Sequence, residues 1–306
     1  MAATVALLLL AGCSVKKYAI RQVGASLNSG PSVYETDEDI ELVGDALPFS
    51  LKFVETLLAE VPDDRNLLIT AARGFTLYSY AYVGYEAEKA YDTDFDEAAR
   101  LRARAVRLYL RAARYGFRGL ETSYPGFEAE LRADPAAAVQ TIDPRKADRD
   151  LPFLYWTASA LGLAVANAKD DANMLARLEE VDALIERALE LDADWDDGAL
   201  HEFMVTFAAA KPGPRAPETI RHHYEQALAQ SGGTSASLYV AYAEAMAVPE
   251  QNVKLFREMI EKALAIDPDA APEDRLANLI AQRKARRLQA HIEDLFLILD
   301  EPAEIP

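Results

Sequence analysis

The stretch from Asp45 to Tyr85, DALPFSLKFVETLLAEVPDDRNLLITAARGFTLYSYAYVGY, decides the fold, because it has the pattern of two amphipathic helices joined by a polar turn. In its first half, apolar residues recur every three or four positions, which places them on one face of a helix. These residues are Leu47, Leu51, Val54 and Leu58. Pro62 and the two aspartates after it predict the turn. Neither helix can bury its apolar face alone, so the stretch predicts a helical hairpin that packs against further hairpins.

Cap and breaker residues predict the ends of these two helices. Asp45 is expected to be the N-cap of the first helix, which would confine Pro48 to its first turn. The second helix is expected to run from Asn66 to about Ala90. Four residues on roughly one side of it form what we call the aromatic row: Phe75, Tyr78, Tyr82 and Tyr85. The row either packs in the core or lines a groove for an apolar ligand or a partner, since tyrosine has a large apolar face and a polar tip.

Later segments repeat the hairpin theme. Three of them carry an Ala-Leu pair near the end of a predicted helix, in RALELD at 187–192, QALA at 226–229 and KALAIDP at 262–268. A small alanine there permits close helix crossing, as in tetratricopeptide repeats. No useful length of the chain alternates with period two, so a sheet is not expected. The predicted fold is all-α, an irregular α-solenoid of tetratricopeptide-like helical hairpins behind a lipoprotein signal peptide.

Arginine and alanine dominate a further predicted helix, from Phe95 to Tyr115. Gly116 follows it and is expected to be its C-terminal stop, because glycine readily adopts the left-handed conformation that ends many helices. Prolines at 125, 135 and 144 make the stretch from Phe117 to Arg149 a long connection or an insertion.

The N-terminus has the form of a lipoprotein signal. An apolar run too short to span a bilayer as a helix ends in Leu10-Ala11-Gly12, directly before Cys13. Cys13 is therefore the expected lipidation site and membrane anchor, and Ser14 after it favours the outer membrane. No Lys or Arg precedes the run, so the start codon is expected to lie upstream. The predicted organisation is a signal peptide over 1–12, a lipidated lead-in over 13–41 and a helical domain over 42–306.

Composition limits the partners. The 306 residues include 50 acidic and 32 basic ones, for a net charge of −18, which argues against a nucleic-acid partner. One compact basic cluster stands out, formed by Arg283, Lys284, Arg286 and Arg287. It is either a solvated helix face or a docking site for an acidic partner or a lipid headgroup. With a single cysteine, the chain has no intrachain disulfide.

Motifs for catalysis, metal binding or cofactor binding are incomplete. The turn DADWDDG at 192–198 resembles a calcium loop, but Phe203 stands where that loop needs its bidentate glutamate. His201-Glu202 lacks the second histidine of a zinc-protease helix, and His222 and His223 diverge around a helix. No glycine-rich phosphate loop or nucleophile elbow occurs. The sequence therefore predicts a protein that is not an enzyme and that has no cofactor and no metal.

Short blocks along nearly the whole chain resemble one family, the T-component of TRAP transporters, whose members are TatT-like lipoproteins. The blocks are Cys13-Ser14 with Lys17-Tyr18-Ala19, Asp45-Ala46-Leu47-Pro48-Phe49, Gly74-Phe75, Arg111-Ala112 with Tyr115-Gly116, Leu154-Tyr155-Trp156, Gly198-Ala199-Leu200-His201-Glu202 and Leu276-Ala277-Asn278-Leu279. The resemblance implies an all-helical, tetratricopeptide-like lipoprotein without catalysis.

The same resemblance implies a partner, the periplasmic solute-binding protein of a tripartite ATP-independent transporter. It also implies assembly as a homotrimer and the passage of a small, hydrophobic ligand, but it assigns no ligand residue. The alternative hypothesis is a general outer-membrane scaffold lipoprotein that holds an envelope assembly together. Identification of the protein that binds this chain would separate the two.

Overall fold

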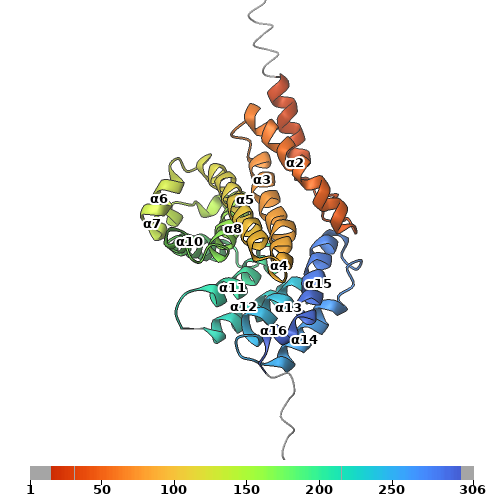
Figure 1. The fold of residues 1–306 in the computed structure, drawn as a ribbon. Helices are drawn as coiled ribbons and strands as arrows, with labels where there is room; N and C mark the ends of the chain where they lie inside the picture. The colour runs from red at the N-terminus through yellow and green to blue at the C-terminus, as the bar shows by residue number, and fades with distance from the viewer. Residues whose placement is uncertain (1–14, 31, 215, 298–306) are drawn as a thin grey trace, which may run out of the picture. The chain divides into compact units, whose positions relative to one another are not determined.

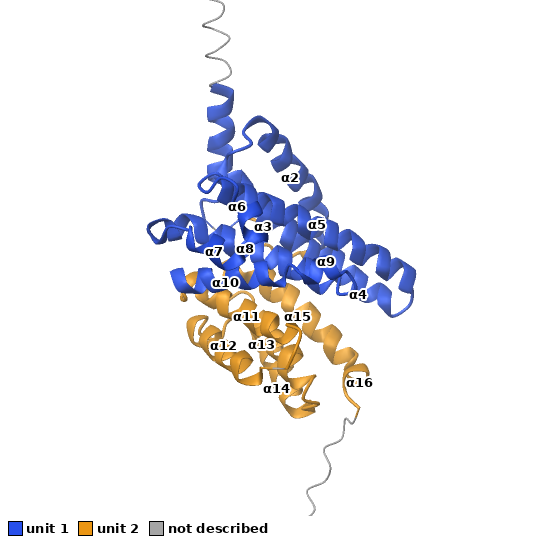
Figure 2. Ribbon diagram, turned by 90° about the vertical axis from the view of Figure 1, so that its left-hand side faces the viewer, with its two compact units in different colours: residues 1–32, 41–191 blue, residues 33–40, 192–306 orange. Residues whose placement is uncertain are grey.

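The computed structural model describes residues 15–30, 32–214 and 216–297, and every secondary-structure element within them is helical (Figure 1). The predicted all-α class is therefore confirmed for this part of the chain. The signal peptide over 1–12 and Cys13 lie outside the described residues. The chain divides into two compact units, coloured separately in Figure 2: unit 1 holds residues 1–32 and 41–191, and unit 2 holds 33–40 and 192–306.

Unit 1 opens with a helix over residues 15–26. Its long helices are α2 (Ile40–Glu60), α3 (Arg65–Tyr78), α5 (Phe95–Glu121), α8 (Ala147–Ala166) and α10 (Leu178–Leu191). Shorter ones are the π-helix η1 (Ser79–Gly84), α4 (Tyr85–Tyr91), α6 (Phe127–Ala133), α7 (Pro135–Gln140), the 3-10 helix η2 (Pro144–Lys146) and α9 (Ala172–Leu175).

Unit 2 holds the 3-10 helix η3 (Trp195–Gly198), α11 (Ala199–Ala210), α12 (Pro217–Gln230), α13 (Ala236–Tyr242), the π-helix η4 (Ala243–Ala247), α14 (Val253–Ala265), the 3-10 helix η5 (Pro272–Asp274), α15 (Arg275–Ala290) and α16 (Ile292–Leu295).

The first predicted hairpin exists, but it begins earlier than expected. α2 starts at Ile40, so the prediction of Asp45 as its N-cap is wrong and Pro48 lies inside the helix. The acidic run before α2 forms the turn instead, because the Asp37 carboxylate accepts a hydrogen bond from the Asp39 amide at 2.8 Å. Of the four residues of the predicted apolar face, Leu51, Val54 and Leu58 are buried and Leu47 is half-buried.

The second helix of this hairpin follows the predicted range as α3, η1 and α4 in succession. Its middle is a π-helix, η1, in which the Ser79 hydroxyl donates to the Phe75 carbonyl at 2.6 Å. Unit 2 has the same succession, since α13 passes directly into the π-helix η4. Such π segments shift the register of side chains along a helix and occur frequently at functional sites.

Gly116 does not end a helix, contrary to the prediction, because α5 continues to Glu121. Its role is close packing against α8. A Cβ atom at Gly116 would lie 2.1 Å from Oγ1 of Thr157, and one at Gly119 would lie 1.9 Å from the Phe153 ring. Both glycines are therefore required by the crossing of α5 and α8, and the expected long connection after residue 116 is built largely of the short helices α6 and α7.

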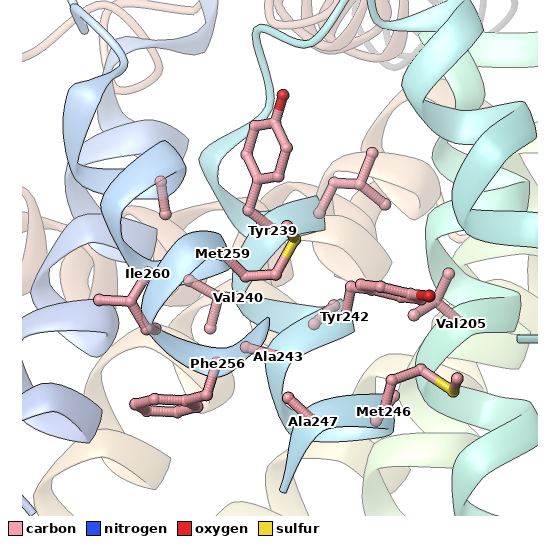
Figure 3. Close-up of a cluster of buried hydrophobic side chains, with 14 of the residues drawn as sticks. Val205, Tyr239, Val240, Tyr242, Ala243, Met246, Ala247, Phe256, Met259 and Ile260 are labelled. Carbon is pink, nitrogen blue, oxygen red and sulfur yellow. The ribbon is translucent and has the colours of Figure 1, made fainter. Parts of the chain in front are cut away.

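The alanines of the three Ala-Leu pairs are buried as predicted. Ala188, Ala227 and Ala263 are each at most 1% exposed. In unit 2, α13 and η4 lie at the centre of an apolar cluster that includes Tyr242, Met246 and Phe256 (Figure 3). A tetratricopeptide-like stacking of the hairpins stays a prediction.

Candidate functional site

The aromatic row lies on the α3–η1–α4 segment of unit 1. Phe75 is only 4% exposed and stacks on Tyr115 of α5, with ring centroids 6.0 Å apart. Tyr78 and Tyr82 are half-buried and stack on each other at 5.8 Å. Tyr85, also half-buried, lies under the Lys89 ammonium at 5.8 Å. The row thus begins in the core and becomes partly accessible along the π-helix.

α2 packs closely over this row. A Cβ atom at Gly44 would lie 2.5 Å from the Tyr82 ring, and one at Gly74 would lie 2.6 Å from a methyl group of Leu51. Glycine at these positions leaves the space that the Tyr82 ring occupies against α2 and that the Leu51 side chain occupies against α3. The role of the row in ligand passage stays a prediction.

One face of α5 carries six arginines, which we call the arginine stripe: Arg100, Arg104, Arg107, Arg111, Arg114 and Arg118. At 3.6 residues per turn they fall within a sector of about 80° and extend over about 27 Å. The opposite face of α5 is buried, with Ala105, Tyr109 and Ala112 each at most 1% exposed. No acidic residue occurs between Ala98 and Leu120. The abundance of arginine in this helix was visible in the sequence, but the stripe was not predicted, although a helical-wheel count of the same residues shows it.

Glu55 of α2 anchors the stripe to its surroundings. Its carboxylate accepts two hydrogen bonds from Arg111, at 2.6 and 2.7 Å, one from Tyr115 at 2.5 Å and one from Lys52 at 2.7 Å. Burial acts to raise the pKa of Glu55, but the hydrogen bonds from Lys52 and Tyr115 and the charge of Arg111 outweigh it and lower that pKa. Burial first, and then Glu55, raise the pKa of the Tyr115 hydroxyl. The network keeps the carboxylate ionised and holds Arg111 in one orientation.

A second feature of unit 1 is a hollow of about 390 Å³ between α7 and α10. Its rim is acidic, with Asp134, Glu179, Asp182, Glu186 and Glu190, and Val139 lies among its apolar lining residues. Arg187 also lines it and is held by Glu190 at 2.8 Å and by the Ile142 carbonyl at 2.8 Å.

Unit 2 brings together histidines from two segments of the chain, 22 residues apart in the sequence. Nδ1 of His201 on α11 lies 2.8 Å from Nδ1 of His223 on α12, so one ring donates and the other accepts. Burial, then the charges of His201 and His222, lower the pKa of His223 to about 4. Burial followed by the charge of His222 also lowers the pKa of His201, against the opposing effect of Asp194. The two rings are therefore neutral near pH 7.

Glu202, next to His201, has no cationic partner among the described residues. Its carboxylate accepts a hydrogen bond from Ser235 at 2.9 Å, and Ser235 and Ser237 lie 3.0 Å apart. Burial raises the pKa of Glu202, and the hydrogen bonds from Ser237 and Ser235 act in the opposite direction. Across the described ranges, no three potential ligands are placed to hold a metal ion.

The predicted basic cluster on α15 is partly neutralised. Lys284 pairs with Glu244 at 2.8 Å, and Nη1 of Arg287 lies 3.4 Å from the His291 ring. Arg286 is exposed, whereas Arg283 is half-buried. The use of this basic cluster as a docking site stays a prediction.

Comparisons with known proteins add one family and one relative. A family model described as TRAP transporter T-component matches residues 36–296, a range that covers most of both units. A protein of Treponema pallidum (strain Nichols), described as uncharacterized, is 29% identical over 306 residues, which cover 95% of each chain. Within the described residues, no helix has the length and apolar character that crossing a membrane requires.

Proposed function

The chain belongs to the TRAP transporter T-component family, and we propose that it serves its transporter as an accessory subunit that binds the periplasmic solute-binding protein directly. The observation that carries this proposal is the family match, which extends over 36–296 and so includes most of the described helices. Helical hairpins support it physically, because arrays of them offer extended surfaces suited to folded partners.

The role of the chain in this proposal is binding, without a catalytic step. The groups with perturbed pKa values serve packing and hydrogen bonding: Glu55 holds Arg111, and His201 and His223 hold each other. An interaction through helix surfaces requires only that these groups keep the helices in place. The family supports a place in the cell envelope, and assembly as a homotrimer is part of the same proposal, which sedimentation of the purified chain would test.

Passage of a small, hydrophobic ligand is the finer part of the proposal, and the aromatic row would carry it. Tyr78, Tyr82 and Tyr85 support this role because their rings are half-buried in succession along one segment. Replacing Tyr82 by alanine should then impair ligand transfer and leave partner binding nearly intact. If the ring serves only as core, the change should lower stability by about 3 to 5 kcal/mol and weaken both activities together.

Attachment to the membrane through acyl chains on Cys13, with the outer membrane favoured, completes the proposal. The motif Leu10-Ala11-Gly12-Cys13 supports it. Labelled palmitate should enter the wild-type chain and should not enter the Cys13→Ala variant. Incorporation of label into the Cys13→Ala variant would show that Cys13 is not the lipidation site.

Co-purification tests the central claim. The lipid-free chain, with residues 1–13 removed, should retain the TRAP solute-binding protein purified from the same cell, in a one-step binding measurement between the two isolated proteins. Absence of binding between the two proteins would contradict the proposal. In a separate pull-down from solubilised cell envelopes, recovery of an envelope-assembly component without the solute-binding protein would favour the scaffold alternative.

A further inference from the structure

The arginine stripe of α5 places six positive side chains on one helix face in a chain whose net charge is −18. Two of its members are neutralised within the unit, Arg100 by Glu97 and Arg111 by Glu55. Arg118 donates to the Pro62 carbonyl at 2.7 Å, and Arg104 lies 3.4 Å from the Tyr78 hydroxyl. Positive charge is therefore left at intervals along one outward face of the helix.

Arg107 and Arg114 are the open positions of the stripe. Both side chains are exposed, and neither forms an ion pair or a hydrogen bond with any residue in the described ranges. Like charges four residues apart, such as Arg114 and Arg118, destabilise a helix by about 0.2 to 0.5 kcal/mol per pair. The stripe thus costs stability in the isolated chain, and an acidic surface placed against it would offset that cost.

Glu55 ties the stripe to α2, since its carboxylate contacts both Arg111 and Lys52. The exposed rings of Phe49 and Phe53 lie on another side of α2, about 120° and 160° around the helix from Glu55, so the surface of the stripe is formed by charged groups.

The geometry points to an acidic face of a folded protein as the occupant of the arginine stripe, and this inference rests on the proposed function, in which that protein is the solute-binding protein. The stripe lies on the outside of one straight helix, and its guanidinium groups are spread along about 27 Å. A small anion needs donors that converge on one point, and these do not. A nucleic acid or an anionic membrane is negatively charged well beyond the length of the stripe, so it would also meet the acidic residues around it, whereas an acidic face of a folded protein can be confined to the stripe.

Arginine also suits this role chemically. Each guanidinium presents a planar fork of donors that fits a carboxylate with two parallel hydrogen bonds, as Arg111 does with Glu55 at 2.6 and 2.7 Å. Arg107 and Arg114 would make equivalent pairs with carboxylates of the partner. Such pairs also steer the encounter between two proteins and raise the association rate at low salt.

A charge-reversal experiment tests the inference. Binding of the lipid-free chain to the purified solute-binding protein is measured for the wild type, for Arg107→Glu with Arg114→Glu, and for a matched control, Lys254→Glu with Arg257→Glu. The control pair lies exposed on α14 in unit 2 and makes no ion pair with any described residue. Both double variants add the same negative charge, so they separate the stripe from the net charge of the chain.

We expect the stripe variant to bind about tenfold more weakly or worse, mainly through a slower association, and to lose most of the salt dependence of the association rate. The control should stay within about twofold of the wild type. Thermal unfolding should show that both variants remain folded, because all four side chains are exposed.

The outcomes separate this inference from the proposed function. If the wild type fails to bind the solute-binding protein, the proposed function fails and takes this inference with it. If the wild type binds and both double variants bind equally well, the proposed function stands and the inference is overturned. If the stripe variant instead loses self-association and keeps its affinity for the solute-binding protein, the acidic face belongs to a second copy, which also overturns the inference.

Discussion

The two units place charge in their interiors in different ways. In unit 1, Asp150 of α8 is fully buried, yet it accepts hydrogen bonds from Arg65 at 2.6 Å and from Tyr124 at 2.8 Å. In unit 2, the side chains of His201 and His223 hydrogen-bond to each other. In unit 1 the buried Asp150 is paired with an opposite charge, whereas in unit 2 the buried His201 is paired with the half-buried His223 and both rings are neutral.

The difference teaches how each unit keeps its shape. The buried ion pair holds the Arg65 guanidinium in one orientation. In that orientation Arg65 also donates to the carbonyls of Gly119 and Arg149, and it thereby connects α3, α5 and α8. A neutral pair holds only while both rings lack the extra proton. Unit 1 therefore presents the arginine stripe on helices that are tied together by charge, and unit 2 depends more on the pH of its surroundings.

The largest effect should come from breaking the ion pair of unit 1. Asp150→Ala leaves the Arg65 guanidinium without its carboxylate and should lower the free energy of unfolding by about 3 to 5 kcal/mol, measured in denaturant. Glu128→Ala is the control, because that carboxylate pairs with Arg132 on an accessible helix face and should cost less than about 1 kcal/mol. Equal losses in the two variants would contradict the role of Asp150.

A smaller effect is expected where α5 crosses α8. Gly119→Ala places a methyl group against the Phe153 ring and should cost about 1 to 3 kcal/mol, as overpacking of a core does. Adding Phe153→Leu should recover part of that loss, because the smaller side chain makes room for the methyl group. The double-mutant cycle measures this coupling. Strictly additive losses would show that Phe153 does not limit the approach of the two helices.

Much of the fold follows from helical periodicity alone. The spacing of Leu51, Val54 and Leu58 predicted the buried face of α2, and the Ala-Leu pairs predicted buried alanines. Both predictions hold because burial in a helix depends on a repeat that the sequence carries locally. The predictions of a helix start at Asp45 and a helix end at Gly116 were wrong. Aspartate and glycine occur inside helices as well as at their ends, so the residue type alone does not fix the boundary.

Tertiary contacts determine which role such a residue has. Glycine ends helices and also permits close crossings, and only the presence of Thr157 opposite Gly116 selects the second role. The division into two units was not predicted either, since it depends on which helices contact one another. The candidate site shows the same limit: the arginines of α5 were visible one by one, whereas Glu55 as the partner of Arg111 required the packing of α2 against α5.

The smallest expected effect is a loss of stability in unit 2 on mild acidification, and His223 should account for it. Its pKa is about 4 in the folded chain, against 6.5 for an unperturbed histidine, so the unfolded state binds more protons between these two pH values. The stabilisation is then fully present above pH 6.5 and is lost as the pH falls towards 4. His201 acts in the same direction, since its pKa is lowered too.

Glu202 acts in the opposite direction, because a raised carboxyl pKa favours the folded state at lower pH. The contribution of the histidine is therefore isolated with His223→Gln, whose neutral amide does not titrate. Between pH 7.5 and pH 5 the wild type should lose about 1 kcal/mol more than this variant, a figure reduced from the full effect of the shift because the ring is partly exposed. Denaturant unfolding at the two pH values measures the difference. Identical pH profiles of the free energy of unfolding would mean that the contact between His201 and His223 does not oppose protonation of His223. The contrast drawn between unit 2 and unit 1 would then be wrong.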